Sequence, residues 1–118
     1  MKATELRIGN IVMCEGLIQT VECICDTDSG EAECCLSLYG NYAISISPIP
    51  LTEEWLLKFG FKVYNEHGWY EINNYHQINL IGDYLVNGVQ CISNKINYVH
   101  QLQNLYFATT GNELTITK

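Results

Sequence analysis

Short runs of alternating apolar and polar residues, separated by turn residues, make up the first part of the chain. Alternation over roughly four to eight residues is typical of a strand with one buried face. It predicts strands at 6–13, 17–25, 33–39 and 42–46. Strands this close in sequence usually pair with their neighbours, so we expect an antiparallel meander or a small curled barrel.

The middle of the chain has the signals of a short helix. Thr52 is a good N-cap, Glu53 and Glu54 put negative charge on the first turn, and Gly60 is placed to end the helix in a left-handed conformation. So short a helix is not stable alone in water. We therefore expect Trp55 to be buried and the helix to be a structural anchor.

A second group of strands and a second helix follow. Strands are predicted at 61–65, 69–72, 77–80, 84–86 and 89–92. Asn87-Gly88, between the last two, is a strong hairpin signal. The second helix is expected at about 98–109, with Asn97 as N-cap and Gly111 as terminator, before a final strand at 114–117.

These elements predict the fold class α+β, mainly β. At 118 residues the chain has an ordinary length for one domain, and we expect residues 1–118 to form it. Ser47-Pro48-Ile49-Pro50 is the one place where the chain could subdivide.

Charge is the most skewed property of the composition. The formal net charge is −7, and no Lys or Arg occurs between Arg7 and Lys58. That interval contains the carboxylates Glu15, Glu22, Asp26, Asp28, Glu31, Glu33, Glu53 and Glu54. A negative field repels phosphate backbones, so we expect no nucleic-acid partner.

The segment MKATELRIGN lacks the apolar core of a signal peptide, and no apolar run approaches the length of a membrane span. We expect a cytoplasmic protein with no membrane partner. Thiols stay reduced in the cytosol, so the six cysteines are expected as free thiols.

Two groups of residues suggest a metal site. Cys23, Cys25, Cys34 and Cys35 could supply four thiolates to zinc, but in strands the last two would point to opposite faces, which favours buried structural cysteines. The segment 26–31 resembles the start of a calcium loop, but an EF-hand needs Gly where Glu31 stands and Glu six residues later. We expect no metal and no cofactor.

Enzyme motifs are missing from the sequence. No phosphate-binding glycine loop, nucleophile elbow or zinc-protease pattern occurs, and His67, His76 and His100 have no nucleophile beside them in sequence. No catalytic residue is therefore predicted.

The second helix carries the candidate interaction residues. Its expected core stripe comprises Tyr98, Val99, Leu102, Leu105, Tyr106 and Thr109. The opposite face, which we call the α2 face, comprises His100, Gln103, Asn104 and Phe107. A helix face without Asp, Glu, Lys or Arg is unusual in water, so this face is either a second buried surface or a docking site for a partner.

Three segments resemble a family of small uncharacterised proteins of gut Bacteroidales, their phages and integrated elements. They are ELRIGNIV at 5–12, PIPLTEEWLLKFGF at 48–61 and VHQLQNLYFATTGNEL at 99–114. Thr109 and Asn112 stand where the family commonly has Leu and Glu. The resemblance implies a phage or mobile-element context and carries over no site residue.

The functional expectation is a non-enzymatic protein that binds another protein or a second copy of itself. The first alternative is an acidic inhibitor that mimics nucleic acid, supported by the acid-only interval. The second alternative is a small enzyme or metal protein.

Overall fold

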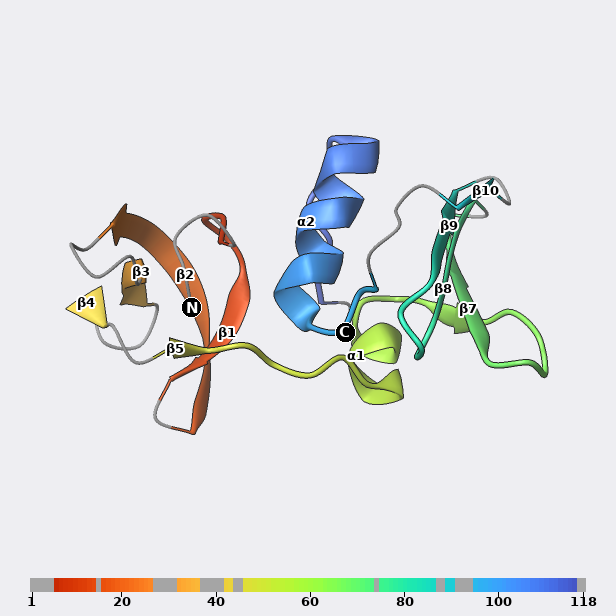
Figure 1. The fold of residues 1–118 in the computed structure, drawn as a ribbon, viewed down its shortest axis with the longest axis horizontal. Coiled ribbons are helices and arrows are strands. Elements are labelled where there is room, and N and C mark those ends of the chain that lie inside the picture. Colours follow the sequence, from red (N-terminus) through yellow and green to blue (C-terminus); the bar gives the residue numbers. More distant parts are fainter. Residues whose placement is uncertain are drawn as a thin grey trace. The chain divides into compact units, whose positions relative to one another are not determined.

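The computed structural model describes residues 6–14, 16–26, 32–36, 42–43, 46–73, 75–86, 89–90 and 95–116. Its contacts divide it into two compact units, which Figure 1 shows in ribbon form. Unit 1 holds the described residues of Met1–Ile49 and of Tyr98–Gly111. Unit 2 holds those of Pro50–Asn97 and of Asn112–Lys118.

Unit 1 contains a five-stranded antiparallel sheet in the order β4-β3-β2-β1-β5. Its strands are β1 (Ile11–Cys14), β2 (Leu17–Asp26), β3 (Ala32–Leu36), β4 (Tyr42–Ala43) and β5 (Ile46–Ser47). The first four pair in sequence order as a meander, and β5 returns to pair with β1. Because β4 and β5 end the order as separate edges, the sheet is open and the barrel alternative is wrong.

β1 begins later than the sequence predicted. Residues 6–10 lie outside the strand because Gly9 has a φ of 97°, a left-handed conformation that interrupts extended backbone. The Gly9 N–H donates to the Val21 carbonyl at 2.8 Å, and the Val21 N–H donates to the Asn10 carbonyl at 2.9 Å. The segment is therefore a turn tied to β2, and we call residues 7–10 the Arg7 turn.

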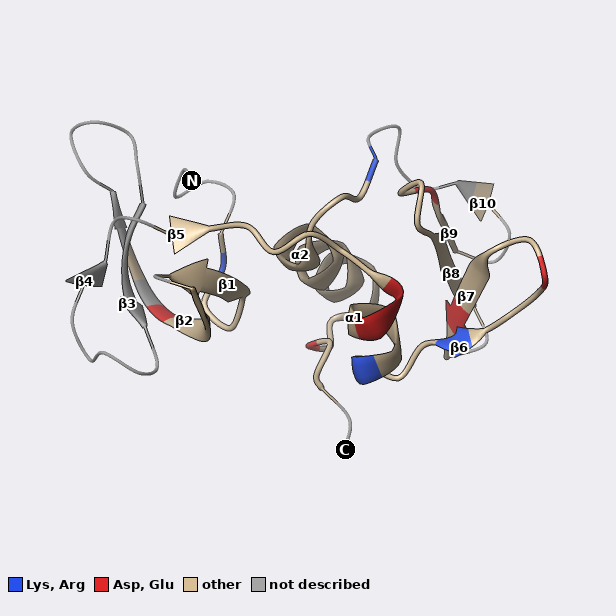
Figure 2. Ribbon diagram, turned by 90° about the horizontal axis from the view of Figure 1, so that it is seen from below, with Lys and Arg blue, Asp and Glu red and all other residues tan. Residues whose placement is uncertain are grey.

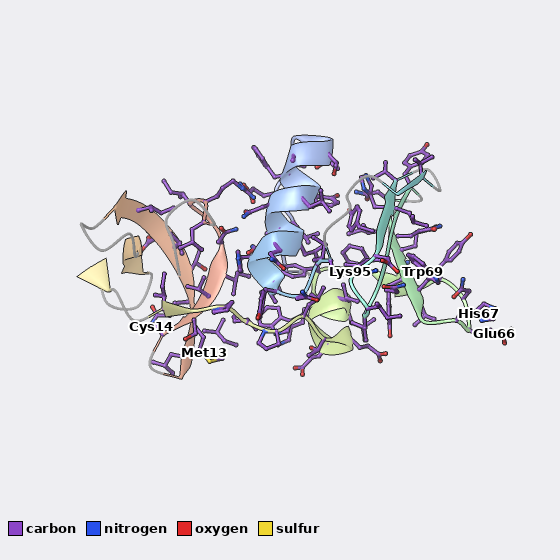
Figure 3. All side chains as sticks on the ribbon, in the orientation of Figure 1. Met13, Cys14, Glu66, His67, Trp69 and Lys95 are labelled. Atoms are coloured by element: carbon purple, nitrogen blue, oxygen red, sulfur yellow. The ribbon has the colours of Figure 1, made fainter. Side chains whose placement is uncertain are left out.

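The described core of unit 1 is one hydrophobic cluster. It comprises Leu6, Val12, Cys14, Val21 and Ile46, with Ile24 against it. Cys14, labelled in Figure 3, is 3% exposed and not disulfide-bonded, so it acts as a small apolar side chain.

Helix α2 (Val99–Thr110) completes unit 1. Gly111 ends it with a φ of 76°, which confirms the predicted terminator. The predicted N-cap Asn97 is wrong. Tyr98 occupies that position, and its N–H donates to the Gln101 Oε1 at 3.1 Å, so the side chain of the third helical residue caps the helix.

Unit 2 contains the second antiparallel sheet, in the order β10-β9-β8-β7-β6. Its strands are β6 (Lys62–Val63), β7 (Trp69–Ile72), β8 (His76–Asn79), β9 (Tyr84–Val86) and β10 (Val89–Gln90). Val86 pairs with Val89, which confirms a hairpin here; its turn residues 87–88 lie outside the described part.

The two faces of this second sheet differ in character. Tyr70, Ile78 and Tyr84 pair across β7, β8 and β9 on one face and are 6% exposed or less. Glu71 and Gln77 are paired neighbours on the other face, where both are half-buried. One face of the sheet is thus buried and largely apolar, whereas the other is half-buried and mixed, with Leu85 in register with Gln77.

Helix α1 (Glu53–Lys58) has the ends that the sequence predicted. The Thr52 side chain accepts from the Trp55 N–H, which confirms the N-cap. Gly60 has a φ of 93°, and the Phe61 N–H reaches the Leu56 carbonyl at 3.0 Å, which closes a Schellman motif. Trp55 is 7% exposed and lies 5.9 Å from the Phe59 ring, so it is buried as expected.

The strand predicted at 114–117 is wrong over its described residues. Residues 113–116 form no strand in the described part, and Leu114 contributes to the fold through a buried side chain instead. Residue 117 lies outside that part.

None of the helices in the described ranges is both long enough and apolar enough to span a membrane.

Candidate functional site: the α2 face and the Arg7 turn

The α2 face runs from buried to exposed along the helix. His100 and Gln103 are each 2% exposed, Asn104 is half-buried and Phe107 is 39% exposed. The predicted core stripe on the other side is also corrected. Val99, Leu102 and Tyr106 are buried, whereas Tyr98 and Leu105 are intermediate. Thr109 is exposed, and its hydroxyl donates to the Leu105 carbonyl at 2.9 Å.

Gln103 connects α2 to the start of β1. Its Oε1 accepts from the Ile11 N–H at 2.8 Å, and its Nε2 donates to the Gly9 carbonyl at 3.2 Å. One side chain thus satisfies a backbone donor and a backbone acceptor where the turn interrupts the strand. A buried amide with both its oxygen and its nitrogen hydrogen-bonded has a structural role.

Asn10 is the second polar member of this contact and is 0% exposed. Its Nδ2 donates to the Asn104 Oδ1 at 2.8 Å, and its Oδ1 accepts from the Arg7 N–H. Its backbone is paired with Arg7 and Val21. Asn10 therefore fixes the shape of the turn and its position on the helix together.

Arg7 covers the exposed end of the α2 face. Its Nε donates to the Asn104 Oδ1 at 2.9 Å and its Nη2 to the Gln103 carbonyl at 3.2 Å. The guanidinium carbon lies 4.4 Å from the centre of the Phe107 ring, in a cation–π contact. Next to it in the turn, Ile8 is 62% exposed.

Three of the four predicted interaction residues therefore contact residues 7–11 of the same unit. Arg7 and Asn10 were missed because the sequence predicted a strand there. The Gly9-Asn10 dipeptide is a turn signal that could have revealed it. Two of the segments that carry the family resemblance, 5–12 and 99–114, are the ones that meet in this contact.

The chemistry of this contact is binding and orientation. Its side chains are amides, a guanidinium and an aromatic ring, which form hydrogen bonds and ring contacts. His100, also on the α2 face, is stacked on Tyr98 with 6.0 Å between ring centres. What these groups can do is hold the turn rigid and present Arg7, Ile8 and Phe107 at the surface.

The other histidines occupy structural positions. His67 lies in the exposed turn 66–68, and the Asn65 Oδ1 accepts from its backbone N–H at 2.9 Å; Figure 3 labels it beside Glu66. His76 is buried on β8, with its Nδ1 3.0 Å from the Tyr84 hydroxyl. Burial lowers the pKa of His76 below its ordinary 6.5.

The cysteines proposed as zinc ligands lie in the first sheet, and most of the candidate calcium loop lies outside the described residues. Cys23 is in register with Cys35, and Cys34 with Ile24 and Ala43. Residues 27–31 of the calcium-loop candidate lie outside the described residues. Across the described ranges, no group of three or more His, Cys, Asp or Glu side chains could hold a metal ion.

The acid-only interval divides between the two units. Glu22 lies in unit 1, Glu53 and Glu54 lie in unit 2, and all three are exposed. Glu53 accepts a hydrogen bond from the Tyr70 hydroxyl, which is the main reason that the pKa of Tyr70 is raised. The other five carboxylates, Glu15, Asp26, Asp28, Glu31 and Glu33, belong to residues or side chains outside the description.

Comparisons with family profiles, with curated proteins and with solved structures found no match.

Proposed function

We propose that this chain is a non-enzymatic interaction protein of phage or mobile-element origin, which binds another protein through Arg7, Ile8 and Phe107. The observation that carries the proposal is that two exposed apolar side chains lie on a turn and a helix joined by buried hydrogen bonds. Ile8 is 62% exposed and Phe107 39% exposed, while Asn10 and Gln103 beneath them are at most 2% exposed.

Rigid presentation favours binding for a thermodynamic reason. A partner that meets a preformed surface does not have to order it, so less of the interaction energy is spent on conformational entropy. Aromatic residues and arginine are also the residue types most enriched at the centres of protein interfaces. Phe107 is accordingly the expected anchor, with Arg7 fixing one side of its ring.

The test compares apolar-to-serine variants at matched exposure. Phe107→Ser and Ile8→Ser remove the proposed surface, and Ile18→Ser removes an apolar side chain that is 49% exposed elsewhere in unit 1. Each tagged variant is used to capture partners from a Bacteroidales host lysate, and its sedimentation is measured for self-association.

We expect the wild-type chain and Ile18→Ser to retain the same partner, and Phe107→Ser to lose it with a loss of stability of only about 1 kcal/mol from the broken cation–π contact. If Phe107→Ser, still folded, keeps the wild-type partner and oligomeric state, the proposed surface is wrong. If the variant unfolds, Phe107 is a core residue and the face serves folding alone.

A further inference from the structure

A polar hollow of about 440 Å³ lies on the β6–β7 hairpin of unit 2. Gly60, Lys62 and Tyr64 line it on one side and Glu71 and Asn73 on the other. Its volume falls within the range of small-ligand sites. The hollow belongs to unit 2, so it is independent of the proposed protein-binding surface in unit 1.

Lys62 and Glu71 stand directly opposite each other in the β6–β7 register. Figure 2 shows the blue segment of β6 beside the red segment of β7. Directly opposed residues have Cβ atoms about 5 Å apart, a separation at which opposite charges ordinarily pair. Within the described ranges, however, the side chain of Lys62 forms no ion pair and no hydrogen bond.

The reason is the strand on the other side of β7. Gln77, the register partner of Glu71 on β8, donates from its Nε2 to the Glu71 Oε2 at 3.0 Å. This bond holds the carboxylate toward β8, whereas Lys62 is exposed on the edge strand β6. An ammonium and a carboxylate thus line one hollow without neutralising each other.

Gly60, which lies two residues before Lys62 and has no side chain, lines the hollow. Gly60 is held at a φ of 93° by the end of α1, a conformation that strains any larger residue. Tyr64 adds an exposed aromatic ring to the lining.

We propose that this hollow binds a small zwitterion of the α-amino-acid class. The ligand carboxylate binds the Lys62 ammonium, and the ligand ammonium binds the Glu71 carboxylate that Gln77 orients. Both contacts are charge-assisted hydrogen bonds, the stronger class in proteins. An aromatic ligand side chain can pack against the Tyr64 ring. Because the charged groups are partly exposed, we expect a dissociation constant of about 1 mM.

The experiment is an amide NMR titration of the full chain with L-phenylalanine, with two of its singly charged analogues and with glucose. 3-Phenylpropionate lacks the ammonium, 2-phenylethylamine lacks the carboxylate, and glucose tests a neutral polyol. We expect saturable shifts at residues 60–64 and 71–73 with phenylalanine, and at least about tenfold weaker binding of the singly charged probes. No saturable shift with phenylalanine, or equal binding of 3-phenylpropionate, overturns the proposal, as does preferential binding of glucose.

Charge variants make the test specific to the hollow. Lys62→Gln and Glu71→Gln should each weaken phenylalanine binding about tenfold. Lys58→Gln and Glu66→Gln make the same charge changes in unit 2 outside the lining and should leave it unchanged. The exchange variant Lys62→Glu/Glu71→Lys should recover part of the affinity, since a zwitterion can bind in the reversed direction. Wild-type binding by both single glutamine variants would overturn the assignment.

Discussion

Replacing Gln103 with leucine tests whether its amide holds the Arg7 turn on α2. Leucine has a similar volume, so the substitution opens little space but removes both polar atoms of a side chain that is 2% exposed. The Ile11 N–H and the Gly9 carbonyl, now 2.8 and 3.2 Å from those atoms, both lose their partner.

The expected loss in the free energy of unfolding follows from these two backbone groups without a hydrogen-bond partner. A buried polar group left unpaired costs about 1–3 kcal/mol, and the half-buried Gly9 carbonyl falls at the lower end of that range. Leucine recovers part of the cost by burying apolar surface. We expect a net loss of about 2–4 kcal/mol. For a chain of this length, with an unfolding entropy of roughly 2 cal/mol/K per residue, about 4 °C in Tm corresponds to each kcal/mol. Gln103→Leu should therefore melt roughly 8–16 °C below the wild-type chain.

Thermal and urea unfolding followed by circular dichroism provide the measurement. Gln77→Leu is the control, because Gln77 is half-buried and its side-chain amide donates to the Glu71 side chain and not to a backbone group. The control should lose no more than about 1 kcal/mol. Equal melting temperatures for the two variants would refute the reasoning, since Gly9 and Ile11 would then have found other partners.

Three further predictions concern unit 2 and metal content. Trp55→Ala should cost about 3–5 kcal/mol by urea unfolding because its ring is buried, whereas Leu57→Ala, at a position 46% exposed, should cost far less; near-wild-type stability of Trp55→Ala would show that its ring is not packed. Because burial lowers the pKa of His76 below 6.5, the unfolded state binds the extra proton first, so stability should be full above about pH 6.5 and fall as the pH drops below it. His76→Gln should flatten that slope, and equal urea midpoints at about pH 7.5 and about pH 5 in the wild-type chain would contradict the assignment. Elemental analysis of the purified chain should find neither zinc nor calcium in stoichiometric amount, and one zinc per chain lost together with folding on chelation would show a metal site.

Local sequence rules predicted the elements whose signals are local. The ends of α1 followed from Thr52 and Gly60, because an N-cap oxygen and a left-handed glycine act within one turn of the helix. The N-terminus of α2 was predicted one residue early because the cap comes from Gln101, a longer side chain that folds back.

Only the helical half of the candidate site could be predicted from the sequence, because the residues that it contacts are distant in sequence. The α2 face could be predicted from helical periodicity, but its cover is the Arg7 turn, and Arg7 and Asn104 are 97 positions apart. Alternating apolar residues favoured a strand there. The turn is stabilised by the Gln103 amide, and no local pattern in the sequence indicates that contact. The placement of Lys62 opposite Glu71 likewise depends on strand register, and a shift of one residue would move either side chain to the other face.

Unit 1 is built from two segments that are far apart in sequence, and this affects how the chain folds during translation. Its sheet strands are complete by Ile49, yet α2 begins at Val99, after all of Pro50–Asn97 has been translated. At typical bacterial and eukaryotic elongation rates of about 5–20 residues per second, that interval lasts roughly 2–10 s. During it the Ile11 N–H and the apolar side chains of β1 lack their helix, so the nascent chain has a defined window in which a chaperone or a second nascent copy could occupy the place of α2.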